Sequence, residues 1–227
     1  MTEHQDRFII LKKMKYGEAD LIIHALSSQG TKKSFIARSA LKSKKRFGGG
    51  VLEPTHFVGL TYRESRSEGG LNVLNEATLI DDFHGLRTDY DKLEIGLFFL
   101  NCVYHVSQEG DQDSQFLFNL LGHSLRALVK TTNPLRLKLH FCLKFLYQQG
   151  VMALDPWMSP FLKTNLADSD QLDVLSSSAS SSDALCGQLP AKNAQASVQQ
   201  SVEDYLDSIE SQVLQYLKTA DNAGSVY

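Results

Sequence analysis

The first eighty residues alternate between apolar and polar positions at the period of β-strands. The runs are rich in β-branched and aromatic residues, and polar turns with glycines at 17 and 30 separate the first three. Five such runs are present, at residues 7–11, 21–26, 32–37, 57–62 and 71–79. Five short strands with regularly spaced turns predict a small antiparallel barrel or sandwich, and a five-stranded barrel of the OB type is the simplest candidate.

After Asp82 the hydrophobic period becomes helical. Three helices are predicted, with the apolar stripes Leu93, Leu97, Leu100 and Tyr104, then Leu117, Leu120, Leu121, Leu125 and Leu128, then Leu135, Leu139, Cys142 and Leu146. Ser114 is the expected N-cap of the second helix, and Pro134 suits the first turn of the third. The fold class is therefore α+β, with a barrel followed by an all-α domain.

The chain loses its periodicity after the third predicted helix and recovers it near the C-terminus. Residues 165–197 include the run SSSASSS and have a linker composition, whereas 198–220 predict an amphipathic helix that docks on the helical domain. The expected domains are residues 1–82 for the barrel, 83–164 for the helical domain, 165–197 for a flexible linker and 198–220 for the last helix.

Charge is distributed very unevenly along this sequence. Residues 1–66 carry thirteen Lys or Arg against six Asp or Glu, and the remainder carries ten against twenty, so the overall charge of −3 combines +7 with −10. Seven of the cations lie within Thr31–Arg46, which contains no acidic residue. Repulsion among such close cations favours a polyanionic partner, and interleaved apolar residues indicate that the segment is folded. A solvated lysine face is the alternative interpretation.

These features predict a nucleic-acid surface on the barrel. The expected phosphate contacts are Lys32, Lys33, Arg38, Lys42, Lys44, Lys45 and Arg46, followed by Lys12, Lys13 and Lys15. Phe35 and Tyr16 are weaker candidates for stacking on bases, because either ring is equally suited to the core. The segment 37–47 is short, polar and compatible with a helix that the glycines at 48–50 would end.

No catalytic or metal-binding pattern is present in the sequence. The three cysteines, Cys102, Cys142 and Cys186, lie forty or more residues apart without a C-x-x-C pair, and the seven histidines form no H-E-x-x-H motif. No nucleophile motif such as G-x-S-x-G occurs. We therefore expect a binding protein rather than an enzyme, without metal or cofactor. No run of eighteen apolar residues and no signal peptide is present, which predicts a cytoplasmic protein without a membrane partner.

Three stretches taken together resemble the RecO family of bacterial recombination mediators: KMKYGEADLII, SSQGTKKSFIARSALKSKKRFGGGVLEP and LNEATLIDDFHGLRTDYDKL. The resemblance extends over about residues 7–160, and Arg46 to Gly49 match an Arg-Phe-Gly-Gly stretch of the family. It implies an OB domain that binds single- and double-stranded DNA, followed by a helical domain. It also implies annealing of strands coated with single-stranded DNA-binding protein and, with the partner RecR, loading of the RecA recombinase at the nucleoid.

The resemblance further implies a pocket for the acidic, Phe-ended tail of single-stranded DNA-binding protein. The cations available for its rim are Arg126, Lys130, Arg136 and Lys138. Many family members have a four-cysteine zinc site where this chain has the linker, so no zinc is expected here. The alternatives are an RNA-binding OB protein, marked by preference for structured RNA, and a hydrolase, marked by metal-dependent turnover.

Overall fold

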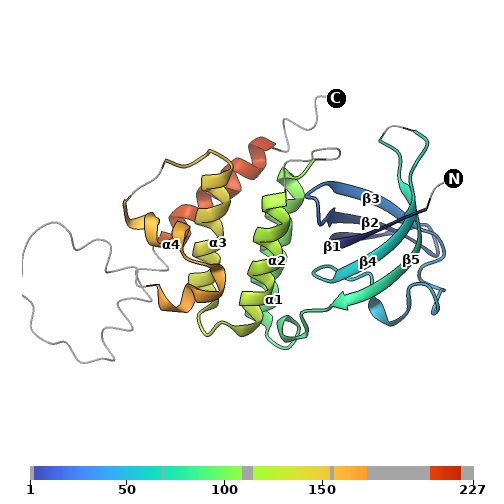
Figure 1. Ribbon diagram of the computed structural model, residues 1–227, viewed down its shortest axis with the longest axis horizontal. Coiled ribbons are helices and arrows are strands. Elements are labelled where there is room, and N and C mark those ends of the chain that lie inside the picture. Colours follow the sequence, from blue (N-terminus) through green and yellow to red (C-terminus); the bar gives the residue numbers. More distant parts are fainter. Residues whose placement is uncertain (1–2, 68, 109–114, 154–155, 173–204, 221–227) are drawn as a thin grey trace, which may run out of the picture. The chain divides into compact units, whose positions relative to one another are not determined.

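The structure is a computed structural model that describes residues 3–67, 69–108, 115–153, 156–172 and 205–220 (Figure 1). The chain divides into two compact units, Met1–Val129 and Lys130–Tyr227. Within the described ranges, the first unit contains five strands, two short 3-10 helices and two long helices, and the second contains the other helices. Among the described residues, no helix combines the length and apolar character that crossing a membrane requires.

A closed five-stranded barrel forms the N-terminal part of the first unit. Its strands are β1 (Glu3–Tyr16), β2 (Asp20–Ser27), β3 (Lys32–Ala37), β4 (Phe57–Arg63) and β5 (Asn72–Asp81). Around the barrel they follow the order β1-β2-β3-β5-β4. Every pairing is antiparallel except that of β3 with β5, which is parallel. The predicted five-stranded OB-like barrel followed by helices is thus confirmed.

Strand β1 is much longer than the predicted strand at 7–11. Its first half pairs with β4, from Glu3 opposite Arg63 to Ile9 opposite Phe57, and its second half pairs with β2. The register with β2 shifts between Ile10 and Lys12. An irregularity of this kind bends a strand, so one strand can serve two neighbours and help to close the barrel.

Aromatic rings fill the interior of the barrel. Phe8, Phe35 and Tyr62 are each at most 1% exposed, and their ring centroids lie 5.1 to 5.9 Å apart in edge-on arrangements. Burial of a side chain of this size stabilises a fold by about 1.5–3 kcal/mol. The alternation predicted for β4 is confirmed, because Val58, Leu60 and Tyr62 all point into this core.

The helices α1 (Tyr90–Val106) and α2 (Gln115–Lys130) complete the first unit, after the 3-10 helix η2 (His84–Leu86). The Asp89 side chain caps α1 by accepting a hydrogen bond from the Lys92 amide. The predicted leucine stripe of α2 is buried throughout, but the stripe of α1 is wrong at Leu97, which is 45% exposed. The buried face of α1 includes Ile95 and Phe99 instead. Ser114 lies outside the described residues.

The second unit is built around α3 (Pro134–Gln148), which Asn133 caps and Pro134 begins. It also contains η3 (Pro156–Met158), α4 (Ser159–Lys163), η4 (Leu166–Gln171) and a helical segment at 205–220. The 205–220 segment contacts α3 through an ion pair of 2.6 Å between Lys138 and Glu210. The element η4 occupies the start of the predicted linker, whereas 173–197 lies outside the described residues. The four predicted domain boundaries stay predictions.

Candidate nucleic-acid interface

Residues 38–47, here called the basic loop, connect β3 to the 3-10 helix η1 (Gly48–Gly50). They form successive turns, so the helix with which this segment is compatible does not form. Ser39 has a φ of 55°, its amide donates to Asp20 Oδ1 at 2.7 Å, and its carbonyl oxygen accepts from the Ser43 amide at 3.0 Å. A positive φ at the first turn interrupts the right-handed helical conformation, and the Asp20 carboxylate holds the chain in this arrangement.

Apolar anchors fix the basic loop to the barrel. Ala40 and Phe47 are each 7% exposed and belong to the barrel core. The Leu41 amide donates to the Ala19 carbonyl oxygen at 3.0 Å, and the Arg46 carbonyl oxygen accepts from the Ala77 amide at 3.3 Å. The backbone of the loop is therefore held on both sides, while its long polar side chains remain at the surface.

Most cations of the basic loop have no acidic partner among the residues that the structure describes. Arg38, Lys42, Lys44 and Lys45 are exposed, and their side chains make no ion pair or hydrogen bond with any residue that the structure describes. Arg46 is also exposed, and its guanidinium donates to the Arg38 carbonyl oxygen at 3.0 Å. Five cations within nine residues are thus available to a phosphate chain at little cost in broken contacts.

The other lysines predicted to contact phosphates differ from the cations of the basic loop, because most of them have partners within the protein. Lys13 pairs with Glu53 at 2.5 Å. The ammonium groups of Lys12 and Lys32 lie 4.9 and 4.8 Å from the ring centroid of Tyr104. Cation–π contacts of this length leave the positive charge in place, so these lysines still contribute to the potential at the surface. Lys15 is exposed and has no partner among the described residues.

Lys33 is part of a hydrogen-bonded chain at one end of the barrel. Its ammonium donates to the Tyr62 hydroxyl at 2.8 Å and lies 3.2 Å from Glu64 Oε1, and the Tyr62 hydroxyl donates to Asp6 at 2.8 Å. Burial lowers the pKa of Lys33, but the bonds to Tyr62 and Glu64 outweigh it, so the pKa is raised overall. Burial also raises the pKa of Tyr62. Lys33 therefore stays charged, but it is held more firmly than the lysines of the basic loop.

The two candidates for base stacking have different environments. Phe35 is 0% exposed and packs edge-on against Phe8 and Tyr62, so the prediction that its ring stacks on bases is wrong. The alternation of β3 directs Phe35 to the interior, where a large apolar ring gains most from burial. Tyr16 is 54% exposed at the end of β1, and its role in stacking stays a prediction.

The four cations predicted to rim a peptide-tail pocket belong to different units. Arg126 is in the unit 1–129, whereas Lys130, Arg136 and Lys138 are in the unit 130–227. Arg136 donates to the Asp170 carbonyl oxygen at 3.0 Å, and Lys138 pairs with Glu210. The tail pocket stays a prediction, with these two cations already bonded within their own unit.

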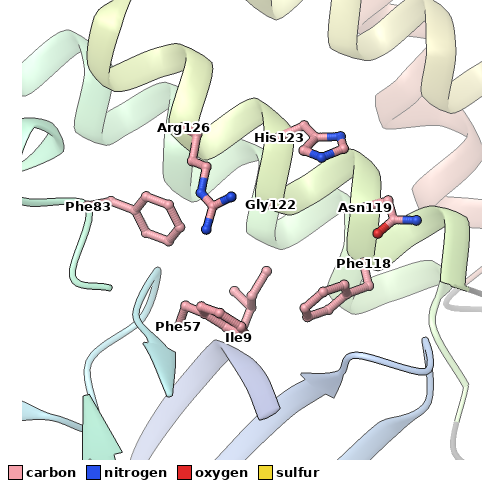
Figure 2. Close-up of a pocket in the computed structure, with 8 residues that line it drawn as sticks. All are labelled: Ile9, Phe57, Phe83, Phe118, Asn119, Gly122, His123 and Arg126. Atoms are coloured by element: carbon pink, nitrogen blue, oxygen red, sulfur yellow. The ribbon is translucent and has the colours of Figure 1, made fainter. Parts of the chain in front are cut away.

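A pocket of about 210 Å³ lies where α2 meets the barrel, and the sequence reasoning did not identify it (Figure 2). Its lining residues are Ile9, Phe57, Phe83, Phe118, Asn119, Gly122, His123 and Arg126. They come from β1, β4, the segment after β5 and α2, so no local motif marks them. In the part of the chain that the structure describes, no group of three or more His, Cys, Asp or Glu is placed to hold a metal ion.

The sequence of this chain is similar to sequences of known proteins. Residues 1–83 match the family model "Recombination protein O N terminal". "DNA repair protein RecO" of Desulfatibacillum aliphaticivorans is 31% identical over 144 residues, covering 63% of this chain and 55% of the relative. The protein of the same name from Syntrophobacter fumaroxidans is 32% identical over 144 residues, covering 63% and 56%. The chain thus spans about half the length of the curated relatives it matches.

Proposed function

The chain belongs to the RecO family, and from this membership we propose that it is a DNA repair and recombination protein that binds DNA through the basic loop. It acts by binding rather than as an enzyme. Single- and double-stranded DNA are both ligands, because the cations contact the phosphate backbone, which both forms of DNA present.

The observation that carries this proposal is the positive charge of the basic loop, which no described acidic residue neutralises. Arg38, Lys42, Lys44 and Lys45 are exposed without an ion pair to any described residue, on a backbone that Ala40 and Phe47 anchor. Each phosphate contact releases counterions from the nucleic acid, which supplies affinity without a built recognition site. Lysine side chains are flexible enough to follow a backbone that is itself moving.

Strand annealing follows from the same chemistry. Two complementary strands repel each other through their phosphates, and pairing requires that this repulsion be offset while the base edges stay accessible. The basic loop can neutralise phosphates without covering bases. We therefore propose that the protein anneals complementary strands, including strands coated with single-stranded DNA-binding protein.

The family resemblance supports the proposed partners. They are RecR, the acidic C-terminal tail of single-stranded DNA-binding protein and, indirectly, RecA, whose loading the protein would promote with RecR. The proposed location is the bacterial cytoplasm, at the nucleoid when the protein is active. Arg126, Lys130, Arg136 and Lys138 are the four cations to replace by Ala in an assay that measures binding of this tail.

The experiment that tests this function measures annealing of two complementary oligonucleotides precoated with cognate single-stranded DNA-binding protein. The native chain is compared with a variant in which Lys42, Lys44, Lys45 and Arg46 are replaced by Ala. We expect the native protein to accelerate annealing and the variant to lose most of that acceleration. All four side chains are exposed, so the variant should fold normally.

A charge-preserving control separates electrostatics from the identity of the side chains. A variant with Lys42, Lys44 and Lys45 replaced by Arg keeps every positive charge, and we expect it to anneal like the native protein. If neither the native protein nor this control anneals DNA, the proposal fails. Tighter binding of structured RNA than of DNA would then support the RNA-binding alternative.

A further inference from the structure

The pocket beneath α2 is lined by three phenylalanine rings. Phe57 and Phe118 have ring centroids 6.0 Å apart at an angle of 60°, and Phe83 closes another side (Figure 2). Ile9 forms the floor from β1. Phe83 is buried, while Phe57 and Phe118 are half-buried, so two of the rings border both the cavity and solvent.

The size of the pocket limits what it can hold. About 210 Å³ is below the roughly 300–1,000 Å³ of sites that take drug-sized molecules. The space suits a single flat ring or one side chain. Apolar aromatic walls favour a planar aromatic group, because its faces can pack against the phenylalanine rings.

Polar groups occur on only one side of this cavity. Asn119, His123 and Arg126 all belong to α2, and the amide of Asn119 can both donate and accept hydrogen bonds (Figure 2). The side chain of Arg126 is 60% exposed, and its Nε lies 3.8 Å from Asp81 Oδ2 in a loose ion pair. Such a pair is worth little to the free protein, so the guanidinium can turn to a phosphate.

We propose that this pocket receives one unstacked nucleobase of single-stranded DNA, with Asn119 at the base edge and Arg126 at the adjoining phosphate. The inference rests on the proposed DNA-binding function and deepens it. The pocket matches a nucleotide, because it has aromatic rings on several sides, polar groups that complement a base edge and a cation at its rim. Asn119 is exposed, and its amide can hydrogen-bond to a base edge, whereas a purely apolar side chain offers it no partner. In this proposal Phe57, Phe83 and Phe118 provide the stacking surface for which Phe35 was a weaker candidate from the sequence.

A larger side chain introduced at Gly122 would occupy the pocket. It lies in α2 and lines the cavity, and a Cβ at this position would lie 3.6 Å from Ile9 Cδ1, which is an ordinary contact. Gly122→Leu therefore places a branched side chain in the space meant for the base. The matched control is Gly122→Ala, which adds only the Cβ. Both replacements improve helix propensity, so α2 should form in each variant.

The assay measures dissociation constants of the full-length protein for two oligonucleotides of equal length, (dT)20 and an abasic strand with the same phosphates. The native protein and Gly122→Ala should bind (dT)20 about tenfold more tightly than the abasic strand, as one stacked base provides. Gly122→Leu should lose this preference and bind the abasic strand unchanged. The salt dependence should be equal in all three proteins, because no phosphate-binding residue is altered.

Several outcomes contradict the inference in distinguishable ways. If Gly122→Leu retains the preference for (dT)20, the pocket holds no base, although DNA binding itself stands. If it retains that preference but no longer binds an acidic peptide ending in Phe, the pocket is a peptide site instead. If the native protein binds neither strand, both the DNA-binding function and the nucleobase pocket are wrong.

Discussion

At the scale of single residues, His140 links the stability of the second unit to pH. It is 0% exposed on α3, where its Nδ1 lies 2.7 Å from Ser169 Oγ. Burial, and to a lesser extent the charge of Lys144, lower its pKa from 6.5 to about 4. Between these values the unfolded chain binds a proton that the folded chain does not, so stability is lost as pH falls. We expect the free energy of unfolding to be about 2 kcal/mol lower at pH 5 than at pH 7.5.

The fluorescence of Trp157, the one tryptophan of the sequence, reports the unfolding of this unit. Its ring centroid lies 6.3 Å from that of Phe161 in the same unit. Urea unfolding followed by its fluorescence gives the stability at each pH. The control is His140→Asn, whose amide can still bond to Ser169 but does not titrate. It should lose about 2 kcal/mol of the pH dependence. An unchanged pH dependence would show that His140 titrates normally.

Residue-scale predictions from the sequence succeeded where packing alone decides the outcome. Cys142 was predicted as a small core residue, and it is 0% exposed on α3. Phe35 was harder, because a strand residue beside lysines suits either a core or a stacking surface. Only closure of the barrel decides which face is interior. The pocket residues Phe57 and Phe83 were missed because their meeting depends on tertiary structure, and no spacing along the chain encodes it.

At the scale of elements, the packing of η2 on α2 requires a residue without a side chain. A Cβ on Gly85 would lie 2.7 Å from Val129 Cγ1, well inside the 3.5–4.0 Å of a normal carbon contact. We expect Gly85→Ala to destabilise the protein by about 1–3 kcal/mol, because valine in a helix has little rotamer freedom to move away. The measurement is the urea concentration at the midpoint of unfolding, compared between the native protein and the variant.

A double-mutant cycle shows whether the cause is this contact. Gly85→Ala combined with Val129→Ala should be more stable than the sum of the two single effects, since the colliding methyl group is gone. Gly59→Ala is the matched control, because a Cβ there would meet its nearest neighbours only at 4.0 Å. Strict additivity of the two changes would mean that Val129 does not restrict position 85.

Elements with a strong internal period were predictable from the sequence, and those set by closure or anchoring were not. The α2 stripe from Leu117 to Leu128 is buried as predicted, because one helix face meets one apolar surface. The parallel pairing of β3 with β5, at Phe35–Asn72 and Ile36–Val73, leaves no mark in local alternation. The basic loop has helix-compatible residues, yet Asp20 and the buried Phe47 hold it in turns.

At the scale of the whole molecule, the distribution of charge matters more than its sum. A protein of net charge −3 should be repelled by DNA if its charges were evenly spread. Here the +7 of residues 1–66 includes the basic loop, and the −10 lies in the rest of the chain. Within a Debye length of about 8 Å at physiological salt, a bound phosphate responds mainly to the local cations. The pI near 6.2 therefore does not argue against DNA binding.

The salt dependence of binding tests this separation of local from net charge. If about six cations meet the phosphates of a single strand, the slope of log K against log salt should be about −4. Replacing Lys44 and Lys45 by Ala removes two contacts, so the slope should become shallower by about 1.4. Fluorescence anisotropy of a labelled (dT)20 at several salt concentrations measures it.

The control for this experiment changes the net charge equally at a distance along the chain. Lys163 and Lys218 are exposed, lie in the second unit and make no ion pair with any described residue. Replacing both by Ala lowers the net charge by two units, as the Lys44 and Lys45 variant does, but should leave the slope unchanged. Equal slopes in the two variants would show that net charge, rather than the basic loop, governs binding. A native slope close to zero would mean that phosphates are not contacted at all.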